Sequence, residues 1–476
     1  MRRPLTLFIV TLITVLTCAT SRAASNDLPE LGDGTSGVVS LQQEHELGRT
    51  WLRQLRRQAP VIESPLAKQY LENLVYQLVP YSDVSSADLE FIIVDQAALN
   101  AFAVPGGIVG INYGLLMHAR DEDELAAVLA HELAHLSQRH FARRIEQSQK
   151  QQPIALATLL ASLLLIASNN PDVGFAGLAS AQAASIQEQL AYSREWEREA
   201  DRLGIRTLAA AGLDPHAMTS MFEQMQRASR FSQRPPEFLL THPVTQFRIS
   251  DAAGRAENYP RKPRSTRFDF LLLKADAQWR YHHDQLNSIE DLQRAIDTTQ
   301  AGDWRAALQV QLAKTLLQQG LTAKANKALE ALDRQRDHAA VVALRAQLLP
   351  SNEALALINT ALTVEPDNRV LLTTLAEQHT RAGNFRAATL AWRTQSERWP
   401  DDPAVWRGLQ QAANGLQDKV TSHYAGAEHL FLNGDQPRAL RQMELAIRSA
   451  RQQGDFQRQA ALESRMKRMA SASDRL

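Results

Sequence analysis

The chain has 476 residues, which at roughly 150 residues per domain predicts about three structural units. Its 44% hydrophobic and 22% charged residues are ordinary for a globular protein and argue against both a disordered chain and a polytopic membrane protein. Lys plus Arg (52) equal Asp plus Glu (52), so no overall field favours nucleic acid or an anionic membrane, and any charge-based function must be local.

The first segment is typical of a secretory signal peptide. Two arginines precede an apolar run from Leu5 to Leu16, and small residues follow up to Ala24. Because this run is shorter than the roughly 20 apolar residues of a transmembrane helix, we predict that residues 1–24 are removed and that the protein is periplasmic. An uncleaved anchor is the alternative. The single cysteine, Cys18, lies inside the leader, so the mature chain cannot form a disulfide.

The residues after this leader indicate one helix and two short strands. Residues 41–55 carry apolar side chains at helical spacing among charged neighbours and predict a surface helix. The run Leu89–Val94 is apolar and rich in β-branched residues, and a second run, Ile108–Ile111, follows the turn sequence Pro-Gly-Gly. We expect the two strands to form a small hairpin or sheet.

Three helices are predicted in the middle of the chain. Asp121, with Glu124 three residues later, resembles a capping box, and the apolar stripe that follows predicts a helix to about His140. Residues 154–167 carry no charge, and at about 1.5 Å per residue a helix there reaches only about two thirds of a hydrocarbon core. We expect a buried helix, with a membrane-contacting or re-entrant segment as the alternative. A further helix is expected from Gln187 to Ala211.

Residues 253–266 mark the expected domain boundary, because a glycine, two prolines and four basic residues stand together there. We therefore predict a first domain over residues 25–262 and an almost entirely helical second domain over residues 263–476. In the second domain Ala354 and Ala388 are 34 residues apart, which is the period of tetratricopeptide repeats. The other repeat anchors are irregularly spaced, so an undifferentiated helical bundle is the alternative.

The sequence His-Glu-Leu-Ala-His at 131–135 indicates a metal centre. On a helix, positions i and i+4 share a face, so His131 and His135 converge on one cation while Glu132 projects beside them as a general base. Zinc is expected, one ion per chain, because neutral imidazole suits it and its coordination permits an open catalytic position. The pattern alone arises by chance in about 4% of such chains, and a structural histidine pair is the alternative.

The third metal ligand is expected to be Glu197. Asp201 follows it at i+4, so one carboxylate can bind the metal while the other orients a ligand imidazole. Glu195 is a weaker rival, because its i+4 partner is Glu199, which is expected on the opposite side of the helix. His140 is set aside as a ligand, since it lies five residues beyond the second histidine of the motif.

Four motifs, in their order along the chain, resemble the Ste24/HtpX-type zinc metallopeptidases. They are NAFAVPGG at 100–107, HELAH at 131–135, EREAD at 197–201 and Thr-His-Pro at 241–243. With the leader and the repeats, the resemblance covers essentially all of the mature chain. It implies a mainly α fold, in which a gluzincin-type metalloprotease domain with a small β-sheet is followed by an α-helical tetratricopeptide-repeat domain.

The resemblance also implies the roles of individual residues. The segment NAFAVPGG would end in an edge strand, about Ile108–Asn112, that holds an extended substrate by backbone pairing. Arg248 and His242 are candidates for steadying the oxyanion. The zinc ligands and the residues that act beside them would be His131, His135 and Glu197 as ligands, Glu132 as general base and acid, and Asp201 as support.

His242 has a second expected role. In this branch of the family a histidine of the His-Pro motif can approach the metal, and a fourth protein ligand would displace the catalytic water. We hypothesise that His242 is a reversible plug, with an ordinary loop histidine beside Pro243 as the alternative.

The predicted function is that of a periplasmic zinc metalloendopeptidase. Members of this family that are secreted and carry repeats are the ones the chain resembles. That resemblance implies action on unfolded or misassembled outer-membrane proteins and contact of the repeats with the outer-membrane β-barrel assembly machinery. The alternative is an assembly chaperone or adaptor whose protease site is normally closed. A third hypothesis is peripheral membrane contact through residues 154–167 and the arginine-rich tail around 438–468, although such a tail is usually a solvated helix face. No nucleic-acid partner is expected.

Overall fold

The computed structural model describes residues 40–84, 88–149, 164, 193–231, 237–264, 266–282, 286, 288–332 and 334–472. The predicted signal peptide and, Leu164 apart, the apolar segment 154–167 lie outside these residues. Among the helices of the described ranges, none combines the length and the apolar character needed to cross a membrane.

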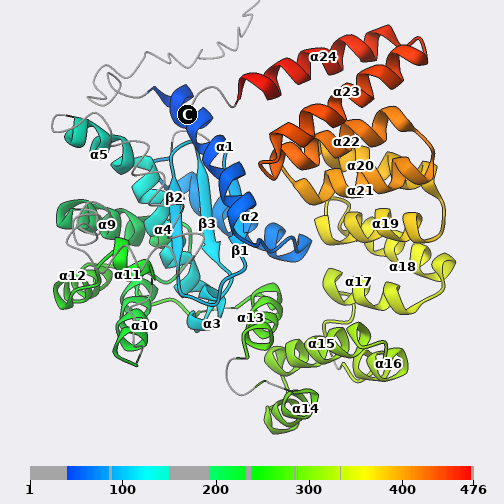
Figure 1. Cartoon of the computed structure of the whole chain (residues 1–476). Helices are drawn as coiled ribbons and strands as arrows, with labels where there is room; N and C mark the ends of the chain where they lie inside the picture. The colour runs from blue at the N-terminus through cyan, green and yellow to red at the C-terminus, as the bar shows by residue number, and fades with distance from the viewer. Residues whose placement is uncertain are drawn as a thin grey trace, which may run out of the picture.

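A three-stranded sheet forms the centre of the first half of the chain (Figure 1). Its strands are β1 (Glu90–Val94), β2 (Ala101–Val104) and β3 (Ile108–Asn112), in the spatial order β1-β3-β2. β1 pairs with β3 in parallel, and β2 pairs with β3 antiparallel through the turn at Gly106 and Gly107, which both have positive φ.

This order confirms one expectation and corrects another. The predicted strands 89–94 and 108–111 form a small sheet, as parallel neighbours and not as a hairpin, but the predicted edge strand Ile108–Asn112 is the central strand. Within the described residues the outer strands are β1 and the unpredicted β2. Gly110 in β3 faces Phe102 in β2, and a Cβ at this glycine would lie 2.2 Å from the aromatic ring. The glycine therefore leaves room for the ring to lie across the central strand.

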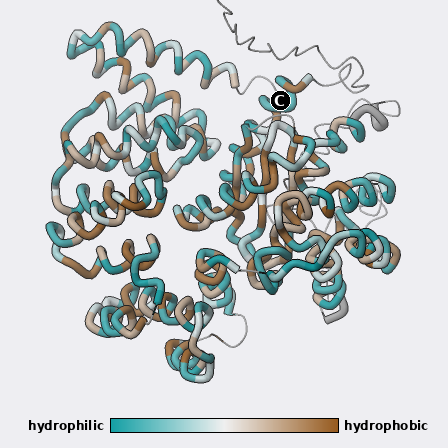
Figure 2. Tube along the Cα trace, turned by 180° about the vertical axis from the view of Figure 1, so that it is seen from behind, coloured by the Kyte–Doolittle hydropathy of each residue, from teal (hydrophilic) through white to brown (hydrophobic). Residues whose placement is uncertain are grey.

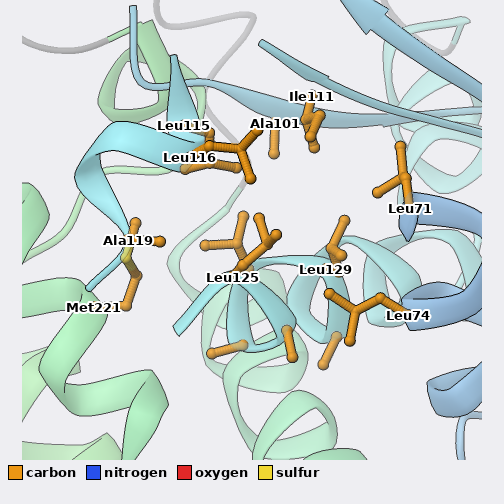
Figure 3. Close-up of a cluster of buried hydrophobic side chains, with 14 of the residues drawn as sticks. Leu71, Leu74, Ala101, Ile111, Leu115, Leu116, Ala119, Leu125, Leu129 and Met221 are labelled. Carbon is orange, nitrogen blue, oxygen red and sulfur yellow. The ribbon is translucent and has the colours of Figure 1, made fainter. Parts of the chain in front are cut away.

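Helices pack around this sheet. They are α1 (Leu41–Gln58), α2 (Pro65–Leu78), the 3₁₀ helix η1 (Val79–Tyr81), α3 (Leu115–His118), α4 (Glu122–Ser137), α5 (His140–Gln149), α9 (Arg194–Ala210), α10 (Ala217–Phe231), α11 (Glu237–Thr241) and α12 (Gln246–Ala256). Leu125 and Leu129 of α4 point toward Ala101 and Ile111 of the sheet, and Leu71 and Leu74 of α2 lie in the same core on the Leu129 side (Figure 3). Seen from behind, the strands and the helix beneath them are largely apolar, whereas the outer helices alternate between apolar and polar positions (Figure 2).

The helix that carries the HELAH motif begins as predicted and ends earlier. The Asp121 side chain caps it by accepting a hydrogen bond from the Glu124 backbone N–H at 3.0 Å. The sequence predicts a helix to about His140, but the helix ends at Ser137 because Arg139 adopts φ of 49°, outside the helical region. His140 therefore opens a new helix, α5, and its side chain takes a direction that helical periodicity does not predict.

The second half of the chain is helical throughout its described residues. Its helices are α13 (Phe268–Arg280), α14 (Ile289–Thr298), α15 (Asp303–Gln318), α16 (Thr322–Glu330), α17 (Ala339–Leu348), α18 (Ser351–Val364), α19 (Arg369–Arg381), α20 (Phe385–Arg398), α21 (Pro403–Gly415), α22 (Lys419–Leu432), α23 (Gln436–Gln452) and α24 (Phe456–Ser471). They form successive hairpins that curve beside the sheet-containing half (Figure 1). Gly320, Gly383 and Gly434 each adopt φ between 73° and 76° just after a helix and so allow the sharp turn into the next one.

The two halves share core and charge contacts. α13 places Phe270 and Leu273 in the core around the sheet and Leu272 in the neighbouring core of the helical half. The domain boundary after residue 262 thus stays a prediction. Further along, the Lys68 ammonium of α2 lies 2.6 Å from a carboxylate oxygen of Asp402, and the Arg369 guanidinium binds the other oxygen of that carboxylate, also at 2.6 Å.

Candidate metal centre

Four buried side chains bring ligand atoms together between α4 and α9. They are His131 and His135 from α4, Glu197 from α9, and His242 just after α11, and one ligand atom of each lies within 4.8 Å of the others. The Nε2 atoms of the two α4 histidines are 3.0 Å apart, and the Nε2 of His135 is 3.3 Å from Glu197 Oε1. The Nδ1 of His242 is 2.9 Å from the same carboxylate oxygen and 3.4 Å from His131 Nε2.

These spacings fit a zinc ion. Bonds of roughly 2.0–2.2 Å in a tetrahedron separate neighbouring ligand atoms by about 3.3–3.6 Å. The four neighbouring pairs above are 2.9 Å to 3.4 Å apart, and His131 Nε2 lies 3.5 Å from Glu197 Oε2, so all five distances are close to that range. Imidazole nitrogen and carboxylate oxygen are also donors that zinc takes in catalytic sites.

Asp201 and Arg248 hold the ligands from behind. The Nδ1 of His131 is 2.9 Å from an oxygen of Asp201, so the other ring nitrogen faces the centre. Arg248 donates to both oxygens of that aspartate, at 2.8 Å and 2.7 Å, and its Nη1 lies 2.6 Å from Glu197 Oε2 and donates to the Pro243 carbonyl. With its guanidinium turned to these groups, Arg248 is placed to position two carboxylates rather than to steady an oxyanion.

The surroundings leave one carboxylate and one imidazole of the site in the form that a metal ion binds. Burial would raise the pKa of Glu197, but the neighbouring His242 and Arg248 hold that pKa well below its usual range, so the carboxylate is ionised. Burial lowers the pKa of His135 well below its usual value, which leaves the neutral imidazole that metal ions bind.

Glu132 lies in the same enclosure without a fixed partner. It is buried, and among the described residues its Oε1 has no hydrogen-bond partner. The His242 Nε2 lies 3.7 Å from that oxygen, which is beyond hydrogen-bond distance. An unpaired buried carboxylate oxygen next to a ligand is available to a water molecule or a reacting group.

The structure also separates the residues that the sequence left as rivals. Glu195 is exposed on α9, whereas Glu197 is buried among the ligand atoms. Helical spacing places His140 and Glu199 away from the ligands. In the structure the His140 ring lies next to His135, and the Glu199 carboxylate is at hydrogen-bond distance from the other side of that ring. The one sequence signal that could have found His140 is the loss of helical periodicity after Ser137.

Comparison with known proteins was consistent with this site. The model of the family described as Peptidase family M48 matches residues 65–256. A protein of Vibrio cholerae named putative beta-barrel assembly-enhancing protease is 38% identical over 296 residues, which cover 62% of this chain and 58% of that protein. The beta-barrel assembly-enhancing proteases of Yersinia pestis and Escherichia coli K12 are 32% and 31% identical, over 88% and 90% of this chain and 86% and 89% of their own.

The Yersinia pestis and Escherichia coli relatives align with most of this chain, and the matched family region contains every ligand residue of the centre. The chain therefore belongs to peptidase family M48 and is a zinc metalloprotease.

Proposed function

We propose that this protein is a periplasmic zinc metalloendopeptidase that serves the quality control and assembly of outer-membrane β-barrel proteins. The observation that carries the enzymatic part is the convergence of two imidazoles from α4 and one carboxylate from α9, with an unpaired Glu132 oxygen beside them. The biological part is supported by the names of relatives that align over most of the chain.

The residues divide the chemical work between binding and proton transfer. His131, His135 and Glu197 are the proposed zinc ligands. When bound, zinc supplies Lewis-acid polarisation of the scissile carbonyl and lowers the pKa of the attacking water. Glu132 accepts the proton of that water at its free carboxylate oxygen and delivers it to the leaving amine. Arg248 keeps the carboxylate framework in place during both steps.

The free edge of the sheet is the proposed track for the substrate. β2 lies along α4 and is the outer strand on that side within the described residues (Figure 1). An extended polypeptide that pairs with the backbone of β2 would run past the centre, as β-strand addition requires. The substrate strand was expected to pair with residues 108–112, but these are already paired with a strand on both sides. We therefore assign the pairing of substrate to Ala101–Val104.

His242 is the proposed plug of the closed enzyme. Its Nδ1 lies among the other three ligand atoms, so His242 would occupy the coordination position that a catalytic site needs open. His242→Ala is expected to raise cleavage of an unfolded protein and to leave zinc bound by the other three ligands. No gain in cleavage would favour the alternative, a loop histidine that merely packs on Phe238, whose ring lies 4.6 Å away, centroid to centroid.

The helical half is the proposed recruiting surface for clients or for the assembly machinery. A cavity of about 530 Å³ lies between α2 and the helices α13, α15, α17 and α19, and its lining combines apolar side chains such as Leu66 and Leu344 with Lys314 and Glu377. Concave surfaces of helical repeats are suited to extended peptides or partner helices.

The decisive experiment compares wild type with Glu132→Gln. The variant keeps every proposed ligand, so zinc content should be unchanged while cleavage of an unfolded outer-membrane protein falls by at least about 100-fold, as expected for loss of a general base. A chelator should abolish wild-type cleavage, and added zinc should restore it. If Glu132→Gln complements a deletion strain in full, the adaptor function is favoured over proteolysis.

A further inference from the structure

His140 lies directly behind the proposed zinc ligand His135. The Nδ1 atoms of the two imidazoles are 2.8 Å apart, which is hydrogen-bond distance. The Nε2 of His140 is 3.2 Å from Glu199 Oε2, and His140 is fully buried. A chain of contacts therefore runs from the metal centre through two rings to a carboxylate on α9.

The hydrogen positions in this chain follow from the ligand that begins it. His135 turns Nε2 toward the centre, so a neutral His135 carries its proton on Nδ1. That N–H needs an acceptor, and the Nδ1 of His140 can accept only if the proton of His140 is on Nε2. The His140 Nε2–H then donates to the Glu199 carboxylate. The position of each proton is thereby fixed, and every N–H group in the chain of contacts faces an acceptor.

Helix α9 contacts both the ligand atoms and His140, through two neighbouring faces. Glu197 and Asp201, four residues apart, face the ligand atoms and His131. Trp196 and Glu199, three residues apart, face His140: the indole stacks on the imidazole with 5.4 Å between ring centroids and 12° between planes, and the carboxylate accepts its N–H. Residues three or four apart share a helix face, which explains how one helix supplies both pairs.

We propose that His140 and Glu199 are positioning residues for zinc, which fix the tautomer and orientation of His135 as Asp201 does for His131. The proposal rests on the zinc centre of the proposed function and adds two residues to it. A ligand imidazole whose second nitrogen is hydrogen-bonded binds zinc more tightly, and loss of such a partner typically weakens binding about 10–100-fold.

Two substitutions at His140 separate positioning from packing. His140→Asn places its amide oxygen near the position of the imidazole Nδ1, so it keeps an acceptor for His135 but loses the stack on Trp196. His140→Phe keeps an aromatic ring for Trp196 but offers no acceptor. Zinc dissociation constants are measured by competition with a fluorescent chelator on the full mature chain, beside thermal unfolding of the metal-free proteins.

We expect His140→Phe to bind zinc about 10–100-fold more weakly than wild type and His140→Asn to stay within about threefold. Glu199→Leu leaves both rings intact, and because it removes the acceptor of His140 it should weaken zinc binding several-fold. The reverse order, with His140→Phe like wild type and His140→Asn impaired, would show a packing role and overturn the proposal. So would equal affinity in wild type, His140→Phe and Glu199→Leu.

The same measurement distinguishes failure of this inference from failure of the proposed function. If wild type itself binds no zinc at the centre, the metalloprotease assignment fails. If wild type binds zinc and only the comparison among variants disagrees, the assignment stands and the positioning role is wrong. Should His140→Phe not fold, the other two variants still test the proposal, because Glu199→Leu should bind zinc more weakly than His140→Asn.

Discussion

Arg248 pairs with two carboxylates of the metal centre, Glu197 and Asp201, so its removal should lower stability by an amount that depends on zinc. The side chain is 4% exposed and binds Asp201 through two nitrogens and Glu197 through a third. Arg248→Met keeps much of the volume but leaves two buried carboxylates without their cation. Breaking a buried ion pair in this way typically destabilises a protein by about 3–5 kcal/mol.

The size of the loss should differ between metal-free and zinc-bound protein. In the metal-free chain the two carboxylates have only imidazoles as partners, so we expect the full loss of about 3–5 kcal/mol in the free energy of unfolding. Zinc restores a positive charge beside Glu197, so the loss should be smaller when zinc is bound, and zinc should raise the melting temperature of Arg248→Met by more than that of wild type.

The assay is denaturant unfolding of both proteins with zinc and with a chelator. Arg248→Lys serves as the matched control, because it keeps the charge and loses the bidentate geometry. Its free energy of unfolding should lie between those of wild type and Arg248→Met. A loss below about 1 kcal/mol in the metal-free Arg248→Met protein, or an equal loss with and without zinc, would show that Arg248 does not neutralise these carboxylates, since surface pairs contribute no more than that.

Three other substitutions test the packing, a buried acid and the contact between the halves. A Cβ at Gly204 would lie 2.9 Å from Met218 Cε and 3.3 Å from the His131 backbone nitrogen. Gly204→Val should therefore separate α9 from α4, lower the free energy of unfolding by about 1–3 kcal/mol and weaken zinc binding. The control is Gly254→Val, whose Cβ meets nothing within 4 Å and which should leave zinc affinity unchanged. Equal zinc affinities in these two variants would contradict this. Burial raises the pKa of Glu237 from 4.5 to about 7, so between these pH values the folded chain keeps a proton that the unfolded chain has lost. Wild type should therefore lose up to about 3 kcal/mol of stability relative to Glu237→Gln when the pH rises from 4.5 to 8. Parallel pH profiles of stability for the two proteins would show that burial does not raise this pKa. Arg369 is 4% exposed and binds Asp402 and, across the two halves, Glu72 of α2, so Arg369→Met should lower the free energy of unfolding by about 3 kcal/mol. An unchanged unfolding curve would show that the contact between Arg369 and Glu72 does not hold the two halves together.

Local spacing was enough to predict much of the metal centre. His131 and His135 share a helix face because they are four residues apart, and Glu197 precedes Asp201 by the same interval. Each pair is arranged by the geometry of a single helix, and the first of these helices, α4, begins where Asp121 predicts. The placement of the two helices against each other is not local: spacing made Glu197 a candidate for the third ligand, and the family resemblance implied the same residue.

The features that the sequence did not reveal depend on contacts between distant residues or on one unusual backbone angle. Strand order is decided by long-range pairing, so a four-residue strand such as β2, and its position at the edge, could not be inferred from its own residues. Helical spacing excludes His140 only if the helix continues, whereas the positive φ of Arg139 ends it and turns the ring toward His135. The role of Arg248 depends on its contacts to two carboxylates from another helix, which no local pattern shows.

Two imidazoles of α4 and one carboxylate of α9 should together bind a single zinc ion, and the position of that ion can be measured. The measurement is an anomalous difference map at the zinc absorption edge, from crystals of the zinc-loaded protein. We predict one peak per chain at roughly 2.0–2.2 Å from His131 Nε2, His135 Nε2 and a Glu197 oxygen. A fully loaded protein whose zinc peak lies away from these three atoms would show that they are not the ligands.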